Sequence, residues 1–376
     1  MSTNEFELLV PAHVRTPRRH APGKPVKQAE RESGVQCIKL ASNENPFGPS
    51  PRAVAAMQAV LGQANFYPDD SASDLRGLLA TRHGLAPEQV IVTAGSTDLL
   101  GILARTLLAP GLNAVTSQLS FIQYAMVTQA GGATLVQVPL RDDGFDLDGI
   151  AAAITPETRI VFLANPNNPT GTMFSAAALD RFLARMPEHV LVVIDEAYFD
   201  FAEHFAKQRG VEYSHALDYV RQGRKVIVLR TFSKAHGLAG VRAGYGMAHA
   251  DLISYLVRMR PTFSVSAVAQ AAAIAAVADE AHIRRTVENN ATGVARLQAA
   301  ISAMGYRVIP TWANFVYLET GEDAMAVARR LQDAGVIVRP MTPWGAPTAI
   351  RVTAGTPEQN EVFLKAFKKA MKKLSD

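Results

Sequence analysis

Short apolar runs alternate with amphipathic stretches through most of the chain. The runs QVIV, TLVQVPL, RIVFLAN, VLVVI and KVIVL read as strands of a buried sheet. In QVIVTAGSTDLLGILARTLL the apolar run ends in a tight turn and passes into an amphipathic helix. Alternation of this kind predicts an α/β fold with a mainly parallel sheet covered by helices on both faces.

The two ends of the chain depart from this pattern. Near the N-terminus an irregular arm precedes the short strand CIKLAS and a helix from Pro51 to Gln63. From about Ala267 long helices and the short strands YRVIP, NFVYLE and AIRVTA follow, which is typical of a separate α+β lobe. The predicted parts are an N-terminal arm (1–35), a segment that contributes to a small domain (36–62), a large sheet domain (63–266) and a small C-terminal α+β domain (267–376).

Length and composition agree with two domains. The chain has 376 residues, 48% of them apolar and 19% charged, as in ordinary globular proteins. Cys37 is the single cysteine, which excludes an internal disulfide framework and fits a cytoplasmic setting. We expect no signal peptide, and the Ala-rich window SVSAVAQAAAIAAVADE predicts a packed helix rather than a membrane span.

Charge is dispersed along the chain. The 38 basic and 34 acidic residues give a net charge of +4, with no basic stripe that would indicate a nucleic-acid partner. Two local exceptions are the arginines of residues 15–19 and the lysines of KAFKKAMKK, whose helical spacing favours a solvated helix face. The expected partners are therefore small molecules, not nucleic acid or membrane.

Polar residues gather directly after the predicted strands. In an open parallel sheet, ligands bind beyond the carboxyl ends of the strands, so these residues should share one site. The residues after the strands, in chain order, are Gly95, Ser96, Thr97, Asn168, Asp195, Tyr198, Thr231, Ser233, Lys234 and Arg242.

The chemistry of this set is specific. The Ser96–Thr97 turn opens a helix, whose N–H groups and dipole would hold a phosphate together with Arg242. Asp195 after VLVVI would need a positive partner such as a protonated ring nitrogen. A desolvated Lys234 beside Arg242 would have a lowered amine pKa and could form an imine. These groups match pyridoxal phosphate.

Each motif also has an ordinary structural explanation. The Gly-Ser-Thr turn can be a helix cap, Asp195 can pair locally, and NPNNPTG can be a surface turn. The order of the motifs and their shared place at strand ends favour one cofactor site. A Rossmann or P-loop site is disfavoured, because GLAGVRAGYG is not G-x-G-x-x-G and no segment reads G-x-x-x-x-G-K-[ST].

Seven motifs in this order resemble the fold-type I pyridoxal-phosphate aminotransferases. They are SNENPFGPSP, NFYPD, AGSTD, NPNNPTG, DEAYFDF, RTFSKAHGLAGVRAGYG and IRVTAGTPEQN. The resemblance extends from about Leu9 to Lys368 and is greatest to the histidinol-phosphate aminotransferase branch. It implies a pyridoxal 5'-phosphate cofactor, histidine biosynthesis as the setting, and a homodimer in which Tyr67 of NFYPD reaches the neighbouring subunit's cofactor phosphate.

The resemblance also implies a role for each matching residue. Lys234 would carry the cofactor, Asp195 would pair with the pyridine nitrogen, and Tyr198 and Asn168 would bind the ring oxygen. Arg351 of IRVTAGT would bind a substrate carboxylate or phosphate. The phosphate of the cofactor would lie among Gly95, Ser96, Thr97, Thr231, Ser233 and Arg242, and the substrate among Asn43, Asn168, Arg339 and Arg351.

Two positions depart from the branch's pattern. Leu119-Ser120-Phe121 stands where Pro-Thr-aromatic is usual, so Phe121 is the expected ring-stacking residue and Tyr124 the alternate. In the N-terminal arm His20 stands where an aromatic that covers the substrate is expected. At His20 the resemblance therefore does not extend to the aromatic substrate cover.

Arg339 in VIVRP lies twelve residues before Arg351, and both belong to short strands of the smaller lobe. Two guanidinium groups in one cleft would suit a dianion, which favours histidinol phosphate with 2-oxoglutarate as the substrates; alternatively Arg339 is a solvated rim residue. The other activities considered are an aromatic amino acid aminotransferase, a decarboxylase on the same fold and a non-catalytic binding domain.

Overall fold

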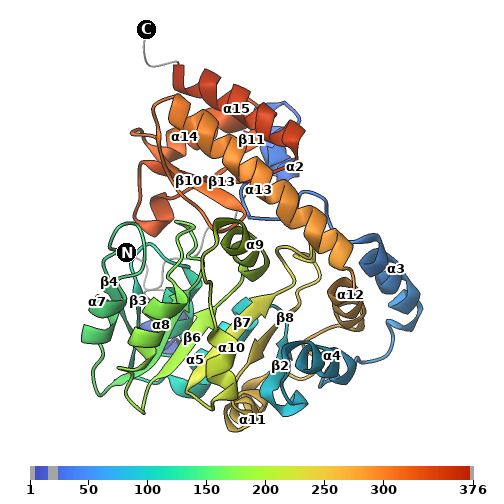
Figure 1. The fold of residues 1–376 in the computed structure, drawn as a ribbon, viewed down its shortest axis with the longest axis vertical. Helices are drawn as coiled ribbons and strands as arrows, with labels where there is room; N and C mark the ends of the chain where they lie inside the picture. The colour runs from blue at the N-terminus through green and yellow to red at the C-terminus, as the bar shows by residue number, and fades with distance from the viewer. Residues whose placement is uncertain (1–4, 16–23, 373–376) are drawn as a thin grey trace.

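The computed structural model describes residues 5–15 and 24–372 and has two lobes (Figure 1). The larger lobe is built on a seven-stranded sheet of order β2-β8-β7-β6-β5-β3-β4. Its strands are β2 (Val90–Thr93), β3 (Asn113–Ser117), β4 (Thr134–Val138), β5 (Thr158–Ala164), β6 (Leu191–Asp195), β7 (Val226–Thr231) and β8 (Gly244–Met247). All neighbouring strands run parallel except β8, which is antiparallel to both β2 and β7. The predicted mainly parallel α/β sheet is confirmed.

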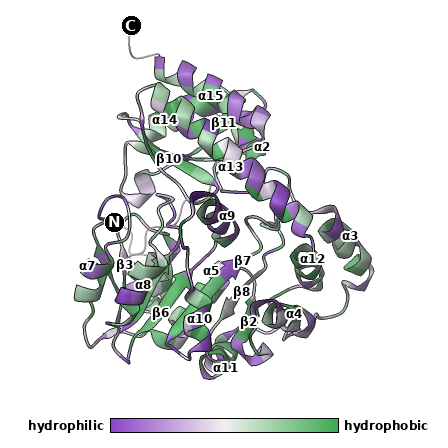
Figure 2. Ribbon diagram, in the orientation of Figure 1, coloured by the Kyte–Doolittle hydropathy of each residue, from purple (hydrophilic) through white to green (hydrophobic). Residues whose placement is uncertain are grey.

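Helices cover both faces of this sheet. Alternate residues of each strand point to opposite sides, and on both sides they are mostly apolar and need to be buried. In β6, Val192 and Ile194 belong to one core and Leu191 and Val193 to the other. Figure 2 shows the strands as the apolar centre of the lobe. The first face is covered by α4 (Ser73–His83), α7 (Leu147–Ala152), α8 (Ala176–Leu183), α10 (Ala216–Arg221) and α12 (Ala267–Val277), and the second by α5 (Ser96–Leu107), α6 (Gln123–Ala130) and α11 (Ala250–Met259).

The smaller lobe has a four-stranded antiparallel sheet of order β12-β13-β10-β9. Its strands are β9 (Arg307–Ile309), β10 (Phe315–Glu319), β12 (Arg339–Pro340) and β13 (Ala349–Thr353), and its helices are α13 (Glu280–Ala303), α14 (Ala324–Asp333) and α15 (Pro357–Lys372). Residues from the three helices and from β10 and β13 form one apolar core. The predicted strands YRVIP, NFVYLE and AIRVTA are β9, β10 and β13.

The N-terminal part of the chain contacts both lobes. Strand β1 (Ile38–Lys39) pairs in parallel with β11 (Val336–Ile337) of the smaller lobe. Helix α3 (Pro51–Val60) instead packs on α12, and Ala53 joins the same core as Ala269 and Ala273. The remaining helices are α1 (Ala12–Arg15), α2 (Val26–Ser33) and α9 (Phe199–Arg209). The predicted domain boundaries stay a prediction, and the packing of α12 favours a boundary after this helix rather than at Ala267.

Two strands were not predicted from the sequence. Strand β3 (NAVTS) carries an asparagine and two hydroxyl residues, so it has no apolar run. Strand β8 (GYGM) lies in the glycine-rich segment that follows Lys234 and was interpreted only as part of the site. A Cβ on Gly246 would lie 2.4 Å from Cδ2 of Leu99, so the close packing of α5 on β8 needs a glycine.

Candidate active site

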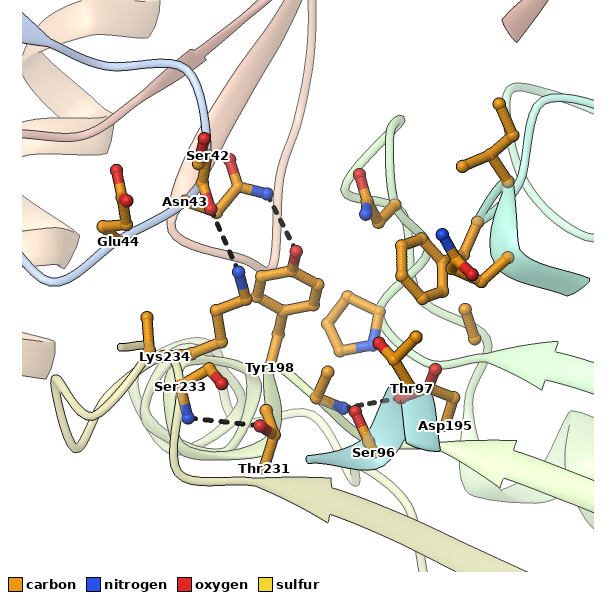
Figure 3. A pocket seen from close by; sticks show the side chains of 18 of the residues that line it. Ser42, Asn43, Glu44, Ser96, Thr97, Asp195, Tyr198, Thr231, Ser233 and Lys234 are labelled. Atoms are coloured by element: carbon orange, nitrogen blue, oxygen red, sulfur yellow. Dashed lines mark hydrogen bonds between the residues drawn. The ribbon is translucent and has the colours of Figure 1, made fainter. Parts of the chain in front are cut away.

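A cavity of about 320 Å³ lies at the carboxyl ends of β2, β5, β6 and β7 and is closed on the other side by β12 and β13. Figure 3 shows labelled side chains of the larger lobe and of the segment at residues 42–44 converging on it. Nearly all the residues predicted for the site line it, namely Asn43, Ser96, Thr97, Phe121, Asn168, Asp195, Tyr198, Thr231, Ser233, Lys234, Arg242, Arg339 and Arg351. Gly95 lies directly behind this lining and Tyr67 lies outside it.

Lys234 follows β7 by three residues and points into the cavity (Figure 3). Its Nζ donates a hydrogen bond of 3.1 Å to the carbonyl oxygen of Ser42 and lies 5.7 Å from the ring centre of Tyr198. Burial lowers the pKa of Lys234 to about 7, helped by the positive charge of Arg351 and less by that of Arg242. The amine is therefore available in its neutral, nucleophilic form near neutral pH.

Asp195 is the last residue of β6 and is 4% exposed. Tyr124 donates its hydroxyl to Oδ2 at 3.0 Å, and the backbone N–H of Ala197 donates to Oδ1 at 3.2 Å. Burial raises the pKa of Asp195 to about 6, although both hydrogen bonds oppose this effect. A buried carboxylate of this kind would be stabilised by a cationic partner in the cavity.

The structure also separates the two candidates for ring stacking. The hydroxyl of Tyr124 is engaged by Asp195, and its ring is stacked on Phe162 with centres 4.8 Å apart. Both residues line the cavity, but Tyr124 is fully buried, whereas Phe121, which lies edge-on to it, is partly exposed. This arrangement favours Phe121 for the stacking role, which stays a prediction.

One end of the cavity, where the cofactor phosphate is predicted to bind, is a cradle of backbone N–H groups and one guanidinium. Helix α5 begins at Ser96, and the preceding Gly95 has φ 96°. A Cβ on Gly95 would lie 2.5 Å from Nη2 of Arg242, so glycine is needed for the guanidinium to reach the helix start. Arg242 donates to Oγ of Ser233 at 3.1 Å, and the N–H of Ser233 donates to Oγ1 of Thr231 at 3.1 Å. The helix dipole and Arg242 together favour an anion here.

A second group of contacts joins the lobes across the cavity. Nδ2 of Asn43 donates to the hydroxyl of Tyr198 at 2.8 Å, which connects the N-terminal segment to the loop after β6. Arg351 donates to Oδ1 of Asn168 and, at 2.9 Å, to the carbonyl oxygen of Ala41. These bonds fix the polar wall at the interface between the lobes.

The two predicted substrate arginines lie side by side. Arg339 of β12 and Arg351 of β13 are direct partners in the antiparallel register, so both side chains project from one face of the sheet. Burial lowers the pKa of Arg351 to about 10 and also lowers that of Arg339, and the charge of Arg339 contributes to the shift of Arg351. Nε of Arg351 is buried and has no hydrogen-bond partner among the described residues. This wall is therefore prepared for an anion.

Sequence reasoning missed part of the lining. Ser42 contributes a backbone carbonyl, which no residue type signals, and Glu44 and Trp344 also line the cavity. Glu44 stood inside the SNENP motif, whereas Trp344 had no signal except its closeness to Arg339 in the chain. Tyr67 is 81% exposed and stacks on Phe263 with ring centres 4.6 Å apart. His20 lies outside the described residues.

The cavity fits the expected cofactor in its chemistry. It offers an anion cradle at Arg242, a buried carboxylate at Asp195 and an amine of lowered pKa at Lys234, each on a different strand end. An apolar ring at Phe121 and hydroxyl and amide groups at Tyr198 and Asn168 complete the lining. Such a set can hold a planar cation with an attached phosphate and present an amine to it.

Comparison with known proteins agrees with this chemistry. A family model described as aminotransferase class I and II matches residues 35–367. The histidinol-phosphate aminotransferase of Moorella thermoacetica is 45% identical over 94% of this chain and 90% of its own. Histidinol-phosphate aminotransferase 2 of Pseudomonas aeruginosa is 43% identical over 98% of this chain and 99% of its own.

Solved structures agree as well. The histidinol-phosphate aminotransferase of Sinorhizobium meliloti, solved in complex with pyridoxal-5'-phosphate, superposes with a TM-score of 0.87 at 29% identity over 97% of this chain and 98% of that one. The predicted fold-type I architecture is thereby confirmed. The chain belongs to the class I and II aminotransferase family, and within it resembles the histidinol-phosphate aminotransferases.

Proposed function

We propose that this protein is a pyridoxal-phosphate-dependent aminotransferase that moves an amino group reversibly between L-histidinol phosphate and 2-oxoglutarate. Histidine biosynthesis is the corresponding setting. The observation that carries the proposal is the cross-strand pair Arg339 and Arg351, which gives one wall of the cavity two adjacent guanidinium groups. The names and the 40–45% identity of its full-length relatives support the same substrate.

Each group of the large lobe has a proposed task. Pyridoxal phosphate, when bound, supplies an electron-accepting ring on which an amino group can be exchanged. Lys234 would hold the cofactor covalently and would move the proton at the substrate's α-carbon. Asp195 holds the ring nitrogen in its protonated form, and Tyr198 and Asn168 bind the ring oxygen. The start of α5, together with Thr231, Ser233 and Arg242, would hold the phosphate.

The small lobe would choose the substrate. A guanidinium group presents paired N–H donors to a carboxylate or a phosphate, so Arg351 can serve both substrates in turn. A second guanidinium at Arg339 adds charge that a phosphate dianion uses more fully than a single carboxylate does. This explains how one cavity can accept histidinol phosphate in one half-reaction and glutamate in the other.

The rival activities predict different outcomes. An aromatic amino acid aminotransferase would favour phenylalanine or tyrosine as the amino donor. A decarboxylase would release carbon dioxide without converting 2-oxoglutarate into glutamate. A non-catalytic binding domain would have no need of the buried pair Lys234 and Asp195, whose shifted pKa values are typical of working groups.

Catalytic efficiency with different amino donors tests the proposal. Wild-type protein should prefer histidinol phosphate to phenylalanine and tyrosine. Arg339→Ala should lose roughly 2 kcal/mol or more of transition-state stabilisation with histidinol phosphate and much less with phenylalanine, because a charge-assisted hydrogen bond is removed. A wild type that prefers phenylalanine, or equal losses for both donors, refutes the substrate assignment.

A homodimer with shared sites is part of the proposal. Phe66 and Tyr67 are 71% and 81% exposed, and Phe263, on which Tyr67 stacks, is 42% exposed, so these apolar rings form a surface patch beyond the cavity. Covering this patch with a second copy would bring Tyr67 to the partner's cofactor phosphate. No described helix is long and apolar enough to cross a membrane, and the cytoplasmic location remains part of the proposal.

Subunit mixing tests the shared site. Lys234→Ala and Tyr67→Ala protein, each weakly active or inactive alone, should together regain activity above the sum of the two, because one site of each mixed dimer has both native residues. Mixtures that never exceed this sum, under conditions where subunits exchange, contradict the shared site.

A further inference from the structure

Trp344 is a cavity residue without a role in the proposed function. It ends the short 3-10 helix η4 (Thr342–Trp344), which follows β12, and it lines the cavity together with Arg339 and Arg351. The loop around it is held by its own backbone, because the N–H groups of Trp344 and Ala346 donate to the carbonyl oxygen of Met341 at 2.8 and 3.2 Å. The indole ring packs against the apolar cluster that includes Met341. Its place is therefore fixed independently of any ligand.

The ring of Trp344 faces Arg339. The guanidinium carbon of Arg339 lies 4.9 Å from the ring centre, within the range of a cation–π contact. The direct cross-strand partner of Arg339 is Arg351, and like charges in opposed positions repel each other. The electron-rich face of the indole offsets this repulsion.

Arg351 is supported in the same manner. Its guanidinium carbon lies 5.2 Å from the ring centre of Phe315 on the neighbouring strand β10. Stacking on a ring uses the flat face of a guanidinium and leaves the N–H groups at its edge available for hydrogen bonds. Two arginines that each rest on an aromatic ring can therefore turn their N–H edges toward one oxyanion.

From these contacts we infer that Trp344 is a positioning residue for the substrate's phosphate: its ring holds the guanidinium of Arg339 beside that of Arg351. This inference rests on the proposed function, because it assumes a phosphate-bearing amino donor. Trp344 acts on the phosphate only through Arg339. An aromatic ring, rather than an apolar side chain of any shape, is required at this position.

A double-mutant cycle tests the dependence on Arg339. Trp344→Leu should lower kcat/KM for histidinol phosphate about five- to tenfold, mainly by raising KM, whereas Trp344→Phe should stay within about twofold of wild type. In the Arg339→Ala background, Trp344→Leu should add less than about a twofold loss. Losses that multiply in the double variant, or no loss in Trp344→Leu, overturn the inference.

Trp312 is a matched control. It is the other tryptophan of the chain, and its ring also carries an arginine, Arg209, at 4.3 Å, but it does not line the cavity. Trp312→Leu thus removes the same ring and a similar contact away from the substrate. It should change kcat/KM less than about twofold. A loss equal to that of Trp344→Leu would mean that both act through general destabilisation and would overturn the inference.

Fluorescence gives a readout that does not depend on turnover. Since the chain has two tryptophans, Trp312→Phe holoenzyme reports on Trp344 alone. Inorganic phosphate should change its emission saturably, and Arg339→Ala should abolish the change; an unresponsive emission overturns the inference. If phosphate changes the emission but the wild type does not use histidinol phosphate, the proposed function fails and with it the substrate named in the inference, whereas the positioning of Arg339 by Trp344 at an anion site stands. If histidinol phosphate is preferred but the losses multiply, the inference alone fails.

Discussion

The cavity has one wall from the seven-stranded sheet and one from the small lobe, and the two hold buried charge differently. In the first wall, charges of both signs lie at the end of β6 and in the segment between β7 and β8, and each is bound by polar neighbours, as Asp195 is by Tyr124 and Arg242 by Ser233. In the second, Arg339 and Arg351 are two like charges on adjacent strands, each supported by an aromatic ring.

This difference shows what each wall is built to meet. The sheet wall matches a ligand that carries a cation and a phosphate at fixed separation, whereas the small-lobe wall matches only an anion. Burial shifts Asp195 and Lys234 toward their neutral forms, so both can change protonation near neutral pH. Arg351 stays charged, since its pKa of about 10 still lies well above neutrality. The sheet wall can thus perform chemistry, and the small-lobe wall can only bind.

Removing Lys234 from the sheet wall should cause the largest loss of activity. Lys234→Ala should lower kcat by at least about a thousandfold, because the nucleophile and the proton carrier are lost together. Borohydride reduction in the presence of the cofactor, followed by mass measurement, should find no covalent adduct. Lys207→Ala, at a side chain that is 74% exposed, is the control that should label normally. Covalent labelling of Lys234→Ala would contradict the assignment.

Removing Arg351 from the small-lobe wall should lower catalytic efficiency equally for all amino donors. Arg351→Ala leaves Asn168 and the carbonyl of Ala41 without their donor, and it should cost about 3 kcal/mol in kcat/KM for every amino donor. Both half-reactions, with histidinol phosphate and with glutamate, measure this. Arg296→Ala, an exposed ion-pair residue on α13, is the control. A loss confined to histidinol phosphate would assign Arg351 the selective role proposed for Arg339.

Burial of Asp195 in the sheet wall should lower the stability of cofactor-free protein. The folded pKa of Asp195 is raised from 3.8 to about 6, so the stability present below pH 3.8 is lost as the pH rises through 6. Asp195→Asn removes this titration and should be up to about 3 kcal/mol more stable than wild type above pH 7, with no difference below pH 4. Urea unfolding across this pH range measures it. Asp251→Asn, at a side chain that is 86% exposed, should show no such trend. If Asp195→Asn is less stable than wild type at pH 8, burial of the Asp195 carboxylate does not destabilise the protein.

The smallest effect should come from Tyr67, which belongs to neither wall of its own subunit. Tyr67→Phe removes one hydroxyl and should weaken the apparent affinity for pyridoxal phosphate about three- to fivefold, or about 1 kcal/mol. Titration of cofactor-free protein at a fixed subunit concentration measures this. Tyr255→Phe, at another exposed tyrosine, should behave as wild type. Identical affinities for the two variants would remove the hydroxyl of Tyr67 from the site.

Sequence reasoning was most successful where a motif followed a strand. The apolar runs of β5, β6 and β7 placed the carboxyl edge of the sheet, and the residues after them, such as Asp195 and Lys234, line the cavity. It failed at β3 and β8, whose polar or glycine-rich sequences lack an apolar run. It also named Arg242 as the cationic neighbour that lowers the pKa of Lys234, whereas Arg351 from the other lobe has the larger effect.

The sequence by itself determined the family, most strands of the large sheet and most of the residues at its edge, because strand patterns and motifs are local and each occupies a short stretch of chain. Only the tertiary structure decided how the two lobes share the cavity. The bond from Lys234 to the carbonyl of Ser42, the engagement of Tyr124 by Asp195 and the stacking of Trp344 on Arg339 depend on strand register and on lobe packing. Such contacts join segments that are far apart in the chain or depend on side-chain rotamers. Local sequence does not determine them, because burial and strand register are fixed only when the whole chain packs.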